Sequence, residues 1–153
     1  MSNKIKEIQD NIIDEFALFD EWMDKYQYII DLGKELPLIP DEDKIDERLI
    51  KGCQSRVWLK AERDNSEIIF SADSDAIITK GIIALLIRVL SHQNPEDIAA
   101  ADLYFIDRIG LKDHLSPTRA NGLLNMVEQM KNYGKVFRSS DRRSGSEGVK
   151  SEE

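Results

Sequence analysis

The chain has 153 residues, of which 41% are apolar and 33% charged, a length that suits one globular domain folding without a disulfide or structural metal. Its formal net charge of -8 makes nucleic acid an unfavourable partner, because an acidic surface repels the phosphate backbone. A single cysteine excludes an internal disulfide, a CxxC pair and a cysteine-rich zinc site, and an N-terminus without an apolar signal segment predicts a cytoplasmic location.

Two amphipathic helices are predicted at the start of the chain. Between Ile5 and Phe19 the apolar residues recur every three or four positions, which places them on one helix face. A second helix is predicted to begin after Asp20, a suitable N-cap, and to end at Gly33. The acidic, proline-containing segment 36–44 is predicted to be an extended surface connection.

A small antiparallel sheet of about three strands is predicted next. Residues 56–62 alternate between polar and apolar, residues 67–72 supply a returning strand, and Asp64–Ser66 form the turn between them. A shorter strand at Glu47–Ile50 is expected beside this hairpin, since a hairpin alone is marginally stable in water.

The segment 75–91 is apolar almost all the way round, which is typical of a helix that is buried in a core or spans a membrane. Ser74 can cap this helix. Its apolar part, Ala76–Leu90, contains Lys80 and Arg88 and is shorter than the roughly 20 apolar residues of a membrane span. We therefore predict a central core helix and no membrane partner.

Further helix starts are predicted at Asn94-Pro95 and Ser116-Pro117, and the last helix is predicted to end at Gly134. The polar residues that follow are too poor in apolar side chains to offset the entropy of ordering. The sequence thus predicts an α+β domain over residues 1–134 and a disordered polar C-terminal tail over residues 135–153.

The two histidines, His92 and His114, lack the close spacing of metal ligands on one helix, and we expect no metal site. The sequence also lacks the glycine-rich phosphate-binding and serine-hydrolase motifs. Ordinary enzyme signatures are therefore absent.

Candidate chemistry centres on Cys53. A free cysteine is usually a small buried apolar residue, but Gly52 permits unusual backbone geometry, and Lys51 and Arg56 bring positive charge that favours a thiolate. Composition alone favours neither of two interpretations of Cys53, a structural cysteine or a reactive thiol on a loop.

An ordered pattern of residues extends from Asp20 to Tyr133. Its most specific part is Gly52-Cys53-Gln54-Ser55, followed by Val57-Trp58-Leu59. It also includes Tyr26, Ile29, Ile30, Leu32, Gly33, Leu36, Pro37, Ser74, Asp75, Ala76, Lys80, Gly81, Leu111, His114, Leu115, Ser116, Pro117, Arg119, Gly122 and Leu123. With this pattern the sequence closely resembles the SufE family of sulfur-acceptor proteins.

The resemblance implies an antiparallel sheet packed by helices, related to the IscU-type scaffold fold. It also implies a protein that is not a self-sufficient enzyme and has no cofactor of its own. A SufS-like, pyridoxal-phosphate-dependent cysteine desulfurase forms a persulfide, and Cys53 corresponds to the cysteine that accepts its outer sulfur. The cysteine loop is expected to be sheltered at rest and to swing out about Gly52 when the desulfurase docks.

The resemblance further assigns supporting residues. Gly52, Gln54 and Ser55 correspond to positions that support the loop, and Asp75 and Arg119 to positions near the loop and docking face. Ordinary helix-end electrostatics explain the last two equally well.

We therefore expect a sulfur carrier that stimulates a desulfurase and passes sulfur on for iron–sulfur cluster assembly, with a SufBCD-like scaffold as a possible recipient. The alternatives are a regulatory desulfurase partner that carries no sulfur and the paralogous CsdE-type sulfur-transfer branch. A third alternative is a cysteine hydrolase that pairs Cys53 with His92 or His114, which requires a histidine within hydrogen-bond reach of the sulfur.

Overall fold

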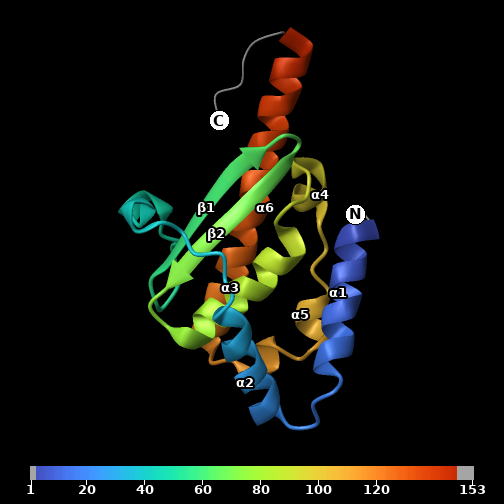
Figure 1. The fold of residues 1–153 in the computed structure, drawn as a ribbon, viewed down its shortest axis with the longest axis vertical. Coiled ribbons are helices and arrows are strands. Elements are labelled where there is room, and N and C mark those ends of the chain that lie inside the picture. The colour runs from blue at the N-terminus through green and yellow to red at the C-terminus, as the bar shows by residue number, and fades with distance from the viewer. Residues whose placement is uncertain (1–2, 148–153) are drawn as a thin grey trace.

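Helix α3 (Ile77–Leu90) lies at the centre of the fold, as its apolar sequence predicts (Figure 1). The computed structural model describes residues 3–147 and buries ten of the 14 residues of this helix. Helices α1 (Asn3–Phe16), α2 (Trp22–Gly33) and α6 (Pro117–Glu147) pack against α3. Among the described residues, no helix is long and apolar enough to cross a membrane.

The sheet is an antiparallel hairpin of strands β1 (Val57–Asp64) and β2 (Glu67–Ser74). At its turn Asn65 has a φ of 57°, a left-handed conformation that asparagine tolerates. The hairpin lies across α3 and α6 (Figure 1), and alternate side chains of both strands are buried, namely Val57, Leu59, Ile68, Phe70 and Ala72. The predicted α+β class with a small antiparallel sheet is therefore confirmed.

The prediction of a third strand at Glu47–Ile50 is wrong. The acidic segment before it folds into two short 3-10 helices, η1 (Asp41–Asp43) and η2 (Asp46–Arg48). These turns bring the chain to β1 in an extended form at one position, where Leu49 makes a single bridge with Trp58. In the described residues the sheet therefore has two strands, with bridges at its edges.

Two of the predicted helix starts are confirmed. Helix α4 (Pro95–Ala100) has proline at its first position, and the Asn94 side chain caps it by accepting a hydrogen bond of 2.9 Å from the Asp97 N–H. Helix α6 begins at Pro117, after the short helix α5 (Phe105–Arg108).

Helix α6 continues past Gly134, where the sequence predicts its end. A Cβ atom at Gly134 would lie 2.8 Å from the backbone nitrogen of Ala99 and 2.9 Å from the carbonyl oxygen of Pro95. The glycine thus permits close approach of α6 to α4 instead of ending the helix. Residues 135–147, predicted to be part of a disordered tail, belong to this helix; residues 148–153 lie outside the described residues, so the domain boundary stays a prediction.

The crossing of α2 and α3 depends on a second close contact. A Cβ atom at Gly81 would collide with the carbonyl oxygen of Ile29. Gly81→Ala is expected to lower the free energy of unfolding by about 1–3 kcal/mol or more, because overpacking at a backbone contact forces the helices apart. Chemical denaturation measures this loss.

Gly122→Ala is the matched control, because a Cβ atom there would meet its nearest neighbour at 3.5 Å, an ordinary contact. This variant should keep or raise the stability, since alanine is the better helix former. Equal stability of the two variants would contradict the close-contact interpretation.

Candidate functional site

Cys53 lies on a loop of residues 51–56 that leads into strand β1. The base of the loop is closed by a hydrogen bond of 2.9 Å from the Ile50 N–H to the Val57 carbonyl oxygen. Within the loop, Gly52 has a φ of 83°, the left-handed region that favours glycine. Residues 51–56 therefore form a short loop that is closed at its base. The tip of this loop, which carries the Cys53 thiol, lies outside the hydrogen bonding of strand β1.

The sulfur of Cys53 rests against the start of α6. Its thiol donates a long hydrogen bond to the Gly122 carbonyl oxygen, with 3.7 Å between sulfur and oxygen. Cys53 is half-buried, and this burial raises the pKa of its thiol above the ordinary value. The expectation that Lys51 and Arg56 favour the thiolate is wrong for this conformation, because both residues are exposed and burial is the cause that shifts the pKa.

A cavity of about 10 Å³ borders the sulfur. Its walls come from the loop, the N-terminal half of α3 and the start of α6, and they are formed by Cys53, Gln54, Ser55, Thr79, Ile82, Arg119, Gly122 and Met126. This volume holds about one water-sized atom. The structure thus brings three of the residues predicted from the sequence, Gln54, Ser55 and Arg119, together with Cys53.

Asp75 and Arg119 lie at different parts of the loop: Asp75 at Arg56, and Arg119 at the cavity beside Cys53. Asp75 fastens its end: the Asp75 carboxylate accepts a hydrogen bond of 3.2 Å from the Arg56 N–H, and the Asp75 N–H donates to the Arg56 carbonyl oxygen at 3.3 Å. Arg119 lines the cavity at the sulfur, and its buried Nε has no hydrogen-bond partner among the described residues. Asp75 therefore supports the loop, and Arg119 faces the site.

Asn125 belongs to the site but was missed by the sequence reasoning. Its Nδ2 donates a hydrogen bond of 3.1 Å to the Gly52 carbonyl oxygen. A spacing signal was available, because Asn125 follows Gly122 by three positions and so lies on the same helix face. That signal has meaning only once the loop is known to pack on this face of α6.

Neither histidine lies at the sulfur. The ring of His114, in the short helix η3 (Lys112–His114), stacks on Trp22 with ring centroids 4.1 Å apart. His92 follows α3, and its Nδ1 lies 4.0 Å from the Glu67 carboxylate. Within residues 3–147, no group of three or more His, Cys, Asp or Glu side chains is placed to hold a metal ion.

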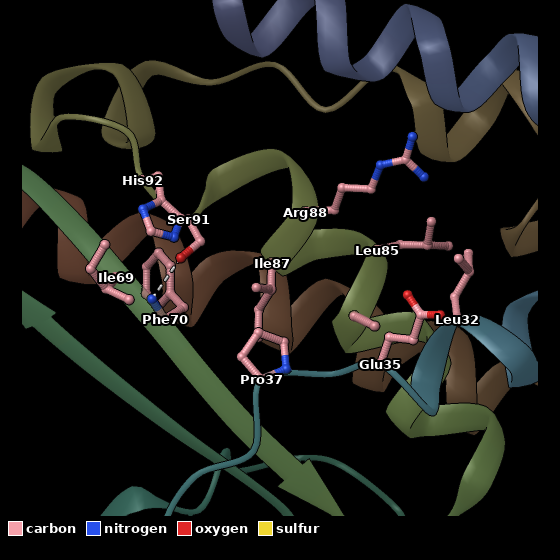
Figure 2. Close-up of a pocket in the computed structure, with 11 residues that line it drawn as sticks. Leu32, Glu35, Pro37, Ile69, Phe70, Leu85, Ile87, Arg88, Ser91 and His92 are labelled. Atoms are coloured by element: carbon pink, nitrogen blue, oxygen red, sulfur yellow. Dashed lines mark hydrogen bonds between the residues drawn. The ribbon is translucent and has the colours of Figure 1, made fainter.

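A larger cavity of about 330 Å³ lies between α2, α3 and β2 (Figure 2). Mostly apolar side chains line it, and on one side the Phe70 N–H donates a hydrogen bond of 2.8 Å to Ser91 Oγ, drawn as a dashed line. It borders the C-terminal half of α3, at Leu85 and Ile87, and no residue of the 51–56 loop lines it. The two cavities therefore use opposite halves of the same helix.

Comparison with known proteins places this site in a family. The sequence matches the SufE family, described as an Fe-S metabolism associated domain, over residues 10–134. An uncharacterized SufE-like protein of Rhizobium meliloti (strain 1021) is 39% identical over 127 residues, which cover 80% of this chain and 91% of that protein. An uncharacterized SufE-like protein of Rhizobium etli is 39% identical over 132 residues, covering 83% and 89% of the two chains.

The fold also has a solved counterpart. The solution structure of a hypothetical protein from Thermus thermophilus aligns with a TM-score of 0.72 and 16% identity, covering 87% of this chain and 97% of that one. The molecule is thus a small α+β protein that presents one thiol on a loop. The chain belongs to the SufE family, and this membership implies a role in sulfur transfer with a cysteine desulfurase.

The half-buried position of Cys53 predicts slow reaction with a neutral alkylating reagent such as iodoacetamide. Because burial raises the thiol pKa, the rate should rise with pH to a midpoint above the ordinary value of about 8.5. The denatured chain is the control, since Cys53 is its single cysteine, and it should react faster at neutral pH. A native midpoint at or below that of the denatured chain would contradict the sheltered thiol.

Proposed function

We propose that this protein accepts a sulfur atom on Cys53 from the persulfide of a SufS-like cysteine desulfurase, stimulates that enzyme and passes the sulfur on for iron–sulfur cluster assembly. A SufBCD-like scaffold is the proposed recipient and the cytoplasm the proposed location. The observation that carries the proposal is the position of Cys53, a single thiol on a short loop beside an atom-sized cavity. Family membership supports the class of reaction.

The proposed transfer is a thiol exchange. The Cys53 thiolate attacks the outer sulfur of the donor persulfide, so a bond from Sγ to that sulfur forms while the sulfur–sulfur bond of the donor breaks. The donor cysteine leaves as a thiolate and takes up the proton that Cys53 has lost. One sulfur atom moves without net oxidation or reduction, so one cysteine is sufficient. The pyridoxal phosphate in this proposal belongs to the desulfurase.

The resting position of Cys53 opposes this attack. The thiol faces the Gly122 carbonyl oxygen, and a thiolate in the same place would be repelled by that oxygen and poorly solvated. We therefore propose that the tip of the loop leaves α6 when the desulfurase docks, while the Ile50–Val57 hydrogen bond keeps the base closed.

The residues around the tip have proposed roles in this movement. Gly52 supplies the hinge, Gln54 and Ser55 flank the sulfur, and Asp75 anchors the far end of the loop. Arg119, which lines the cavity, is the proposed contact to the partner.

Two alternatives use the same fold. A regulatory partner that carries no sulfur would need no reactive Cys53, and the atom-sized cavity at the sulfur favours the carrier over it. The CsdE-type branch differs in its partner and not in the chemistry at Cys53. A cysteine hydrolase is disfavoured, because the hydrogen bond described for the sulfur goes to a backbone carbonyl and both histidines lie elsewhere.

Incubation with a SufS-type desulfurase and cysteine is expected to add the mass of one sulfur atom to Cys53, because the thiol is the acceptor. Mass spectrometry of the intact chain and of the Cys53 peptide measures this gain. Cys53→Ser should gain no sulfur and should cease to stimulate the desulfurase.

The outcomes separate the alternatives. A wild-type chain that binds the desulfurase but never gains sulfur would contradict the carrier. If Cys53→Ser stimulated the desulfurase as fully as the wild type, the regulatory alternative would replace it.

A further inference from the structure

We propose that Asn125 is a positioning residue, which holds the tip of the Cys53 loop, residues 51–55, against α6 and thereby sets how readily the sulfur is exposed. This inference rests on the proposed function, because exposure of the sulfur matters only if Cys53 reacts. Asn125 itself contacts the loop backbone and acts on the sulfur through the loop.

The tip has few ties to the rest of the protein. Among the described residues, two hydrogen bonds connect residues 51–55 to other elements: Asn125 Nδ2 to the Gly52 carbonyl oxygen, and Cys53 Sγ to the Gly122 carbonyl oxygen. Both end on α6, within one helical turn of each other. The hydrogen bonds of Ile50 and Arg56 hold the base and end of the loop, where they do not restrain the tip.

The two ties differ in durability. The sulfur contact is long, at 3.7 Å, and it requires a hydrogen on Sγ. That hydrogen is lost when the thiol ionises, and it is absent when Sγ is bonded to a second sulfur. The Asn125 amide keeps its donor in all three states, so its hydrogen bond is the one that holds the resting loop on α6 whatever the state of the sulfur.

The packing at Gly52 adds a geometric argument. The Asn125 amide lies so close to Gly52 that a Cβ atom there would collide with Nδ2. Gly52 has a left-handed φ of 83°, and its carbonyl oxygen accepts the hydrogen bond from this amide. The Asn125 side chain is therefore packed against the turn at Gly52, whereas a residue on an exposed helix surface would have no such contact.

The test separates the effect of the shape of the Asn125 side chain from the effect of its hydrogen-bond donor. Asn125→Asp keeps nearly the same shape but replaces the NH₂ donor by an oxygen that repels the Gly52 carbonyl, and Asn125→Ala removes both shape and donor. Asn132→Asp, an exposed position two turns further along α6, is the matched control for the added charge. The measurement is the alkylation rate of Cys53 by iodoacetamide over a pH series, with no desulfurase present, together with amide exchange of the whole chain.

We expect both Asn125 variants to react about fivefold faster or more than the wild type near neutral pH, the effect of one ordinary hydrogen bond on a two-state equilibrium. The midpoint of their rate–pH profiles should fall toward that of the denatured chain, because an open loop no longer buries the sulfur. Faster amide exchange should be confined to residues 51–55, and Asn132→Asp should behave as the wild type.

Several results would overturn the proposal. Unchanged alkylation rates in both variants would show that Asn125 does not hold the tip of the loop against α6. A faster rate in Asn125→Ala but not in Asn125→Asp would show that packing of the side chain, and not its NH₂ donor, restrains the loop. Faster exchange throughout the chain, or an equal effect of Asn132→Asp, would indicate general loosening. None of these measurements requires sulfur transfer. A negative result for the role of Asn125 can therefore be distinguished from a failure of the proposed carrier function.

Discussion

The structure depends on the burial of helix α3, whose apolar surface needs partners on nearly every side. Helices α1, α2 and α6 and strand β2 supply them, and at the crossing with α2 the helices approach so closely that Gly81 cannot carry a side chain. Because α6 runs alongside α3, its first turns reach the loop before β1. Thr79 and Ile82 of α3 and Gly122 of α6 then line the cavity at Cys53, and Asn125 of α6 donates a hydrogen bond to the loop.

In this arrangement, the same burial that protects the Cys53 thiol also lowers its reactivity. A half-buried sulfur with a raised pKa is a poor nucleophile and is also slow to oxidise, since both reactions need an accessible thiolate. The fold separates the two demands, because the loop is closed at its own base by Ile50 and Val57 and few hydrogen bonds hold its tip. Such a segment can open without disturbing the core, as local units of low stability do. In the proposed mechanism, exposure of Cys53 therefore requires a small rearrangement of the loop and no unfolding.

The sequence predicted those features that local chemistry determines. Asn94 with Pro95, and Pro117 after Ser116, mark helix starts because caps and fixed dihedral angles act over a few residues. Gly134 does not mark a helix end, because its role is a contact with α4, far away in sequence. The pKa of Cys53 likewise depends on how deeply the loop packs, which the neighbouring charges of Lys51 and Arg56 do not show. Asn125 became visible only when that packing was known.

The central claim is that Cys53, sheltered against α6 at rest, is released to meet the cysteine of a desulfurase. Disulfide cross-linking under mild oxidation tests it most directly, because a disulfide requires the two Cβ atoms to come within about 4.5 Å of each other. We expect a cross-linked heterodimer joined through Cys53 to the catalytic cysteine of the desulfurase. A stable complex that forms no such link, while both thiols remain reduced and intact, would contradict it.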